Sequence, residues 1–281
     1  MVSVLPVPTL DHVVVNLRDR IDEGAEAYRR LGFTLTPRGY HTLGSMNHLA
    51  MFGTDYLELI AAKPDDDSRP EIMAASSGLN GLVFASEDAD ATYQALRAVG
   101  VPIDPPQQFS RPVMVGDRML DATFRTTRLP GGSVPAGRLY FCQHLTRHLV
   151  WRDEWRHHPN GAIGVARAVI AAEDPSRLGE LFRRMFGTET VRQTDEGCSL
   201  LLGLSRFDVV TPGALWEMFG HAAPDSRGRR EYMAALTLRT LSLDAAELAL
   251  EHGGIKGVDR VGTSVLVPAS EAFGVTLEFS V

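Results

Sequence analysis

The sequence has few cysteines and no long apolar run. Cys142 and Cys198 are the only cysteines in 281 residues, too few for a disulfide framework and not spaced as a structural zinc site. No apolar run approaches the length that spans a bilayer, and the N-terminal residues lack the basic and apolar segments of a signal peptide. We therefore exclude a disulfide-stabilised secreted scaffold and expect a cytoplasmic protein that is not embedded in a membrane.

An excess of basic charge is also absent. The chain has 28 Lys and Arg against 35 Asp and Glu, for a formal net charge of -7, and its basic residues form no runs. A nucleic-acid surface needs clustered basic residues, so we expect no nucleic-acid partner. Hydrophobic residues make up 44% of the chain and charged residues 22%, which is typical of a soluble globular protein with one large or two ordinary domains.

A helical spacing of apolar residues recurs along the chain. It predicts a helix over residues 20–31, carried by Ile21, Ala25, Tyr28 and Leu31 and ended by Gly32. The same spacing and the same glycine stop return in a second segment, at Ala89, Tyr93, Leu96, Val99 and Gly100. Two further helices are predicted over 175–186 and 243–252, each again followed by glycine.

Short alternating segments surround each predicted helix. In the first unit, strands are predicted over 10–16, 34–40, 47–52 and 56–61, with Gly44 and Gly53 at turns. The second unit carries an insertion rich in Pro, Gly and Arg over 105–135, for which a substrate-facing loop and a surface excursion are both open. A connector bearing Trp and His residues spans 151–161.

These repeats predict an α+β fold of four βαβββ modules. Four copies of this length are too few for a solenoid, so we expect them to pair into two half-barrel sheets, each enclosing a cavity. We predict a first module pair over residues 1–158 and a second over 159–281. Glu278 of the second pair has no histidine partner in the pattern, so that half is expected to be structural or to form a metal-free pocket.

A histidine and a glutamate mark the first and last strands of the first module. His12 opens the strand Leu10 to Asn16, and Glu58 lies in Tyr56 to Ile60. Both side chains suit a divalent metal, although a hydrogen-bonded histidine and a solvent-facing glutamate are the plainer alternatives. Asn80 occupies the place of His12 in the second module, so the facing module lacks that histidine.

Two stretches resemble the glyoxalase-like family of the vicinal oxygen chelate (VOC) superfamily, which includes glyoxalases, bleomycin-resistance proteins and extradiol dioxygenases. They are Leu10 to Ile60, with Gly39 to Gly44 and Asn47 to Phe52, and Phe141 to Thr146, followed by Val150-Trp151 and His158 to Gly161. The resemblance implies paired VOC modules and a divalent metal, Fe2+, Mn2+, Zn2+ or Ni2+, held by the first and last strands of facing modules. It nominates His12 and Glu58 as ligands, completed by either Gln143 or His144.

The two candidates on the last strand of the second module have different consequences. If His144 faces the cavity, His12, Glu58 and His144 form a two-histidine, one-carboxylate face with open positions. If Gln143 faces it, the set is weaker and richer in oxygen. A metal there would polarise a substrate oxygen, and Glu58 or His144 would move a proton, which makes both catalytic candidates.

Other polar residues are candidates for substrate contact. His41 and His48 lie on adjacent predicted strands of the first module, and Arg111 can bind a carboxylate or phosphate through a guanidinium fork. Gln143 joins them if it is not a ligand.

The leading functional hypothesis is a metal-dependent enzyme acting on a small oxygen-chelating molecule, by isomerase, lyase or ring-cleaving dioxygenase chemistry. A metal-free binding protein of the bleomycin-resistance type and a structural or partner-binding double barrel are the alternatives. The expected partner is a small-molecule substrate, and a homodimer is left open.

Overall fold

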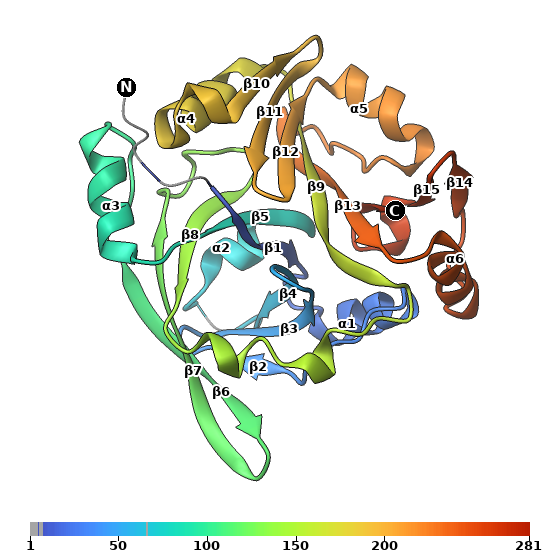
Figure 1. The fold of residues 1–281 in the computed structure, drawn as a ribbon, viewed down its shortest axis with the longest axis horizontal. Helices are drawn as coiled ribbons and strands as arrows, with labels where there is room; N and C mark the ends of the chain where they lie inside the picture. Colours follow the sequence, from blue (N-terminus) through green and yellow to red (C-terminus); the bar gives the residue numbers. More distant parts are fainter. Residues whose placement is uncertain (1–4, 6–7, 66) are drawn as a thin grey trace.

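A computed structural model describes residue 5 and residues 8–65 and 67–281. The strands of these residues form two eight-stranded sheets, ordered β2-β3-β4-β1-β5-β8-β7-β6 and β10-β11-β12-β9-β13-β16-β15-β14 (Figure 1). Each half of each sheet follows the order strand, helix and three strands, so the predicted α+β fold of four βαβββ modules is confirmed.

The first sheet contains the first two modules. Module 1 comprises β1 (Leu10–Asn16), α1 (Ile21–Arg30), β2 (Gly39–Tyr40), β3 (Ser45–Met51) and β4 (Tyr56–Ala62). A short helix, α2 (Pro70–Ala74), leads into module 2, which comprises β5 (Gly78–Ala85), α3 (Ala89–Ala98), β6 (Gln107–Val115), β7 (Arg118–Arg128) and β8 (Arg138–His144).

The second sheet repeats this plan. Module 3 comprises β9 (Ala162–Ala172), α4 (Pro175–Phe186), β10 (Val191–Thr194), β11 (Gly197–Leu202) and β12 (Ser205–Val210). An additional helix, α5 (Pro212–Phe219), precedes module 4, which comprises β13 (Glu231–Thr240), α6 (Leu243–His252), β14 (Asp259–Val261), β15 (Ser264–Val267) and β16 (Thr276–Ser280). Five single-turn 3-10 helices lie in the connections: η1 (Arg147–Leu149), η2 (Asp153–Trp155), η3 (Thr188–Thr190), η4 (Gly220–Ala222) and η5 (Ala269–Glu271).

Two sequence-based expectations differ from the structure. The strand predicted over 34–40 is reduced to the two residues of β2, because only Gly39 and Tyr40 pair with β3 in a ladder, and Thr36 adds one isolated backbone hydrogen bond to Leu49. The insertion over 105–135 is mainly a long antiparallel hairpin, β6–β7, whose tip projects from the sheet in Figure 1. Its alternating residues pair in regular register, which the Pro, Gly and Arg content had obscured.

Local signals place the helices that cover the outer faces of the sheets. The carboxylate of Asp88 accepts the backbone N–H groups of Asp90 and Ala91 at the start of α3, and Asp174 does the same for Ser176 before α4. On α1, the buried positions Ile21, Ala25 and Tyr28 follow one helical face, which packs on the sheet.

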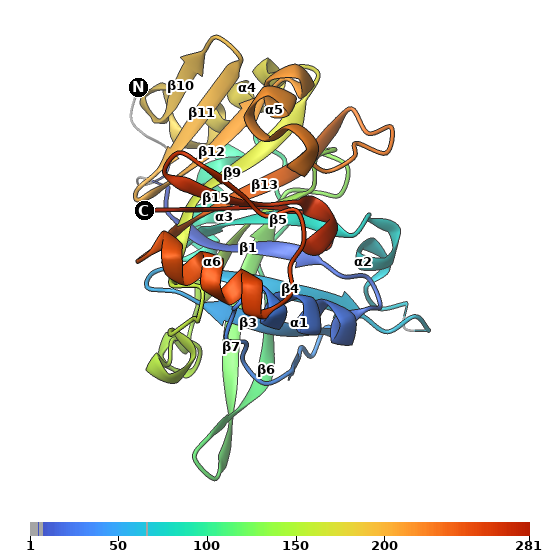
Figure 2. The same ribbon diagram turned by 90° about the vertical axis from the view of Figure 1, so that its right-hand side faces the viewer.

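The two halves share one hydrophobic core, formed by the outer faces of both sheets and their helices. Phe84 of β5 contacts Phe186 of α4 and Phe207 of β12, with ring centroids 4.8 and 5.6 Å apart. Figure 2 shows the two sheets stacked against each other. The predicted boundary near residue 158 lies in the connector between β8 and β9, and the division into two domains stays a prediction.

We define the inner face of each sheet as the face opposite the helices of its βαβββ modules. The inner faces of the two sheets differ. In the second sheet, Leu215 and Phe219 of α5 pack on Val169 and Ala171 of β9, so a helix covers the face where we expected a cavity. The inner face of the first sheet carries a separate cluster around Val14, Leu49 and Tyr140 and remains hollowed.

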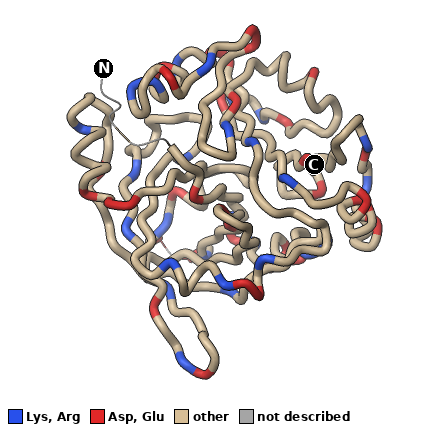
Figure 3. The backbone as a smooth tube through the Cα atoms, in the orientation of Figure 1, with Lys and Arg blue, Asp and Glu red and all other residues tan. Residues whose placement is uncertain are grey.

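Charged residues of both signs are interspersed along the described chain, as Figure 3 shows. No helix within the described residues is long and apolar enough to cross a membrane.

One buried carboxylate joins the halves. Asp55, at the start of β4, accepts a hydrogen bond of 2.9 Å from the backbone N–H of Val165 on β9. It is 2% exposed, and burial raises its pKa from 3.8 to about 6. Burial disfavours the charged form, so the fold is more stable while Asp55 is protonated. This additional stability is complete below the unfolded pKa and is lost as pH rises through about 6.

Asp55→Asn keeps the acceptor oxygen and removes the charge. We expect the stability of the variant relative to the wild type to increase between pH 4 and pH 7.5, by up to about 3 kcal/mol for a pKa rise of this size. Urea unfolding at both pH values measures the difference. If the stabilities of the two proteins changed equally with pH, ionisation of Asp55 would not destabilise the fold.

Candidate functional site

The inner face of the first sheet surrounds a small cavity of about 40 Å³ that is partly open to solvent. Strands of both modules contribute to its wall, since β1, β4, β5 and β8 lie next to one another in the sheet. Its polar side chains are His12, His41, Asn47, Tyr56, Glu58, Arg69, Arg111, Thr126, Arg128, Arg138, Tyr140 and Cys142.

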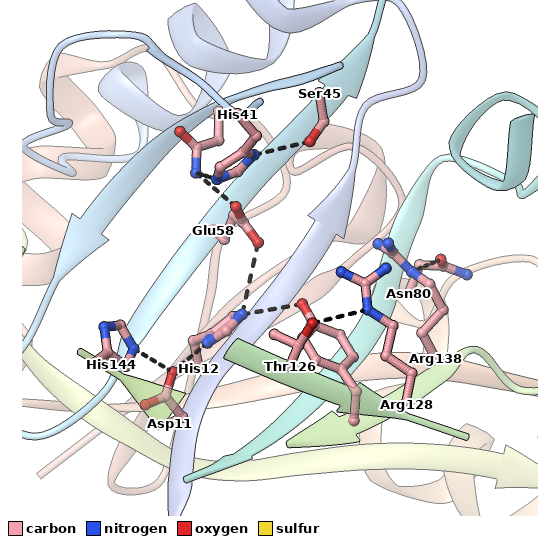
Figure 4. Close-up of polar contacts among 12 residues, drawn as sticks. Asp11, His12, His41, Ser45, Glu58, Asn80, Thr126, Arg128, Arg138 and His144 are labelled. Atoms are coloured by element: carbon pink, nitrogen blue, oxygen red, sulfur yellow. Dashed lines mark hydrogen bonds and ion pairs between the residues drawn. The ribbon is translucent and has the colours of Figure 1, made fainter. Parts of the chain in front are cut away.

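His12 on β1 is held from behind by a carboxylate. Its Nδ1 lies 2.6 Å from Asp11 Oδ1, and its Nε2 faces the cavity, 3.1 Å from the Tyr140 hydroxyl and 3.7 Å from Glu58 Oε2 (Figure 4). Burial alone would raise the pKa of Asp11, but His144 and His12 hold it well below its ordinary value. The ionised Asp11 therefore fixes the proton on Nδ1 and directs the Nε2 lone pair into the cavity.

Glu58 on β4 is oriented by a chain of polar groups. Asn47 donates from Nδ2 to Glu58 Oε1 at 2.6 Å and to His41 Nε2 at 3.3 Å, and His41 Nδ1 lies 2.8 Å from Ser45 Oγ. Burial lowers the pKa of His41 to about 4, so this ring is neutral. Burial opposes ionisation of Glu58, yet surrounding positive charge, including that of Arg138, and the hydrogen bond from Asn47 lower its pKa, so the carboxylate is charged.

The structure separates the two candidates on β8. Tyr140 and Cys142 line the cavity, so alternation puts His144 on that face and Gln143 on the other. The Gln143 amide bonds with the backbone N–H of Ala89 and the carbonyl oxygen of Glu87, at the start of α3.

His144 contacts Asp11 and not Glu58. Its Nε2 lies 3.1 Å from Asp11 Oδ1, on the Nδ1 side of His12, whereas Glu58 lies on the Nε2 side (Figure 4). Its ring packs against Trp151 of the connector, with centroids 4.9 Å apart. The structure therefore brings His12 and Glu58 together, and joins His144 to them only through Asp11.

The other candidates for substrate contact lie partly inside and partly outside the cavity lining. His41 and Arg111 line the cavity. His48 lies outside this lining, where its Nδ1 bonds with the Thr36 carbonyl oxygen at 2.8 Å. The base of the β6–β7 hairpin supplies Arg111 to the cavity, whereas Met114 and Met119 near its tip are exposed.

Several residues of the site were not predicted from the sequence. Asp11 adjoins His12 in the chain, and a carboxylate next to a candidate ligand was an available signal. Tyr140 and Arg138 alternate along β8, but the sequence does not reveal which face of that strand is inward. Arg69 and Arg128 carried no local signal.

The equivalent positions of the second sheet have different chemistry. Glu58 pairs with Val14, two residues after His12, and Asp208 pairs with Val169, two residues after Arg167. Arg167 and Asp208 thus occupy the places of His12 and Glu58. The Arg167 guanidinium lies 2.8 Å from Glu278 and 3.7 Å from Asp208, and it faces the Phe219 ring of α5. Glu278 is therefore paired with an arginine.

His12 and Glu58 fit a divalent cation as a pair. Two ligands of one ion at about 2.1 Å lie about 3–4 Å apart, and the 3.7 Å between Nε2 and Oε2 agrees with this. The Asp11 carboxylate behind His12 is the usual support of a metal-bound histidine. Asn47 Oδ1, buried without a hydrogen-bond partner among the described residues, is a further oxygen nearby.

A second group of ligand types also exists. The ligand atoms of Asp11, Cys142 and His144 lie within 4.8 Å of one another. Asp11 Oδ1 already contacts both imidazole rings, and burial raises the pKa of the Cys142 thiol, so an ion here would have to displace existing hydrogen bonds and a proton. An ion on the His12–Glu58 pair would displace only the hydrogen bond between His12 Nε2 and the Tyr140 hydroxyl.

Paired βαβββ modules around one cavity define the vicinal oxygen chelate fold, and comparison with known proteins agrees. The pattern of the glyoxalase-like domain family matches residues 10–186, more than half of the chain. The chain therefore belongs to the glyoxalase-like family of the VOC superfamily. No curated protein matches the chain significantly.

Solved structures share the fold at low sequence identity. A hypothetical protein from Staphylococcus aureus is 12% identical with a TM-score of 0.67, covering 98% of this chain and 99% of its own. A fusion of a xylose isomerase-like TIM barrel with 4-hydroxyphenylpyruvate dioxygenase is 14% identical with a TM-score of 0.58, covering 98% and 49%. A variant of 4-hydroxymandelate synthase from Streptomyces coelicolor is 12% identical with a TM-score of 0.57, covering 98% and 92%.

Asp11→Asn tests the support of the two imidazole rings. We expect a loss of about 1–4 kcal/mol of stability at pH 7, because both buried hydrogen bonds of Asp11 would exchange a charged acceptor, which contributes about 1.5–3 kcal/mol per bond, for a neutral one, which contributes about 1 kcal/mol. The loss should shrink at acidic pH, since the lowered pKa of Asp11 stabilises the fold above its unfolded value and this is lost as pH falls. Urea unfolding measures the loss of stability, and Asp117→Asn, at an exposed position, is the control. An equal loss in both variants would contradict the prediction.

Proposed function

We propose that the cavity of the first sheet is the active site of a metal-dependent enzyme acting on a small organic molecule that presents adjacent oxygen atoms. The observation that carries the proposal is the placement of His12 Nε2 and Glu58 Oε2 3.7 Å apart on the cavity wall, with Asp11 behind the histidine. The similarity of the fold to the dioxygenase and synthase structures supports an enzyme, without specifying the reaction.

His12 and Glu58 would hold the ion, and its remaining positions would be open to substrate. When bound, a divalent metal polarises a substrate oxygen and stabilises negative charge that develops on it. Isomerisation, lyase chemistry and ring cleavage with dioxygen all require such stabilisation, and the reaction class stays a proposal at that level.

The protein groups around the ion have separate tasks. Asn47 fixes Oε1 of Glu58, so Oε2 is the carboxylate atom free to bind or to accept a proton. Burial raises the pKa of Tyr140, so its hydroxyl is neutral and can donate a hydrogen bond to a substrate oxygen. His144 acts on His12 through Asp11 as a positioning residue, and its role as a direct ligand remains a proposal.

Metal content distinguishes this function from a metal-free binding protein. After purification without chelators and equilibration with Mn2+ or Fe2+, elemental analysis should find metal in the wild type. Removing either ligand, by His12→Ala or Glu58→Gln, should weaken binding at least about tenfold, since losing even a supporting group costs metal sites 10–100-fold.

Asp208→Asn is the matched control, because Asp208 occupies the position of Glu58 in the second sheet. It should leave metal content unchanged. Metal absent from the wild type, or retained equally by Glu58→Gln, would overturn the proposal. Circular dichroism confirms that each variant is folded.

A further inference from the structure

We propose that the ligand of this cavity is a small organic acid with at least two negative charges, bound by Arg111, Arg128 and Arg138. The inference deepens the proposed function by naming its substrate class, and it rests on the same site. The charge of the binding group, carboxylate or phosphate, is what the arginines recognise.

These guanidinium groups face the cavity without carboxylate partners. Arg69 pairs with Glu71 at 2.6 Å, but no described carboxylate lies within 4 Å of the other three guanidiniums. Arg111 is 4% exposed, and its side chain has no hydrogen bond to another described residue. A buried cation without a partner is costly, so an anion that reaches Arg111 relieves a large desolvation penalty.

Arg128 and Arg138 point into the same space (Figure 4). Each is held through Nε by a neutral acceptor, Thr126 Oγ1 at 3.3 Å and Asn80 Oδ1 at 3.2 Å. The terminal nitrogens remain available, and Nη2 of Arg138 is buried without a partner among the described residues. Burial and the nearby Arg69 and Arg138 lower the pKa of Arg128, which indicates that these like charges crowd one region.

The second sheet shows that this excess of charge does not follow from the fold. There, Asp208 and Glu278 neutralise Arg167, and Asp208 also pairs with Arg206. In the first sheet, three unpaired arginines face the cavity together with Glu58, the one carboxylate among its described lining residues. A dianion would neutralise the difference of two positive charges. A bound divalent metal would add further positive charge to the cavity.

The rest of the wall specifies an organic ligand. Leu49, Phe109 and Phe124 line the cavity beside the arginines, and the two phenylalanine rings are stacked with centroids 5.3 Å apart. A carbon skeleton can contact this apolar side while its acidic groups meet the guanidiniums.

Isothermal titration of the full chain, treated with EDTA and at low salt, tests the proposal with two dianionic probes, malonate and inorganic phosphate, against acetate and neutral malonamide. We expect at least one dianion to bind, and both control compounds to bind at least about tenfold more weakly. Malonate binding alone would specify carboxylates, and phosphate binding alone a phosphate group.

Arginine variants locate the binding. Arg128→Gln and Arg138→Gln should each weaken the dianion at least about tenfold, the scale expected for losing a charge-assisted hydrogen bond. Arg125→Gln is the matched control, since Arg125 lies on the same strand as Arg128 but pairs with Asp90 outside the cavity. No binding by either dianion, or an equal loss in the control, would overturn the inference.

Glu58→Gln separates this inference from the proposed function. In the metal-free protein it should preserve or strengthen dianion binding, because it removes a negative charge from the cavity. Dianion binding in a protein that never binds metal would leave the inference standing and reject the metal-dependent function. Metal binding without dianion binding, tested also with Mn2+ present, would leave the metal-dependent function standing and reject the inference of a dianionic ligand.

Gly39→Ala moves an arginine without changing any charge. An added Cβ would lie 2.3 Å from Arg111 Nη1 and 2.5 Å from Asn47 Oδ1, so both side chains must shift. We expect dianion affinity to fall severalfold while the melting temperature changes little, because the displaced atoms are side-chain ends. Unchanged affinity would remove Arg111 from the proposed binding set.

Discussion

The antiparallel pairing of β1 with β5 is the constraint on which the site depends. It places the first strands of two modules side by side, so that β4 and β8 flank them and contribute, with β1, to the wall of one cavity. Strand alternation then decides which residues enter that space. β9 and β13 repeat the arrangement in the second sheet. The fold therefore provides two equivalent positions for a site, and only the side chains at the inner faces determine whether either becomes one.

The side chains at these two equivalent positions differ between the sheets. In the second, an arginine lies between two carboxylates and α5 covers the face, so its charges are satisfied within the protein. In the first, His12 and Glu58 occupy the same places, and Arg111, Arg128 and Arg138 lack carboxylate partners among the described residues. A buried ion pair inside the second sheet is stable without a ligand, whereas the first sheet retains charge that only a bound species can neutralise.

Much of this fold could be predicted from the sequence, because its helices follow strong apolar spacing and glycine stops. The limits of α4 and α6 agree with prediction, whereas the β6–β7 hairpin was missed because its Pro and Gly content is typical of loops. His12 and Glu58 could be nominated from their places in the first module. The contact between His144 and Asp11 could not, since it depends on side-chain directions across strands that are 133 positions apart. Arg111 could be nominated, whereas Arg128 and Arg138 were missed for the same reason: the side of a strand on which an arginine lies is decided by the register of β7 and β8.

The kind of acceptor that holds each arginine distinguishes a binding site from a structural ion pair. Thr126 and Asn80 orient Arg128 and Arg138 without neutralising them, whereas Asp208 and Glu278 both orient and neutralise Arg167. A guanidinium fixed by a neutral oxygen keeps its charge available, and its orientation is settled before the ligand arrives. The cost is paid in the free protein as repulsion between like charges, so binding is favoured both by new contacts and by relief of that repulsion. An arginine paired with a carboxylate has no such gain to offer, because an incoming anion would have to displace the partner that already stabilises it.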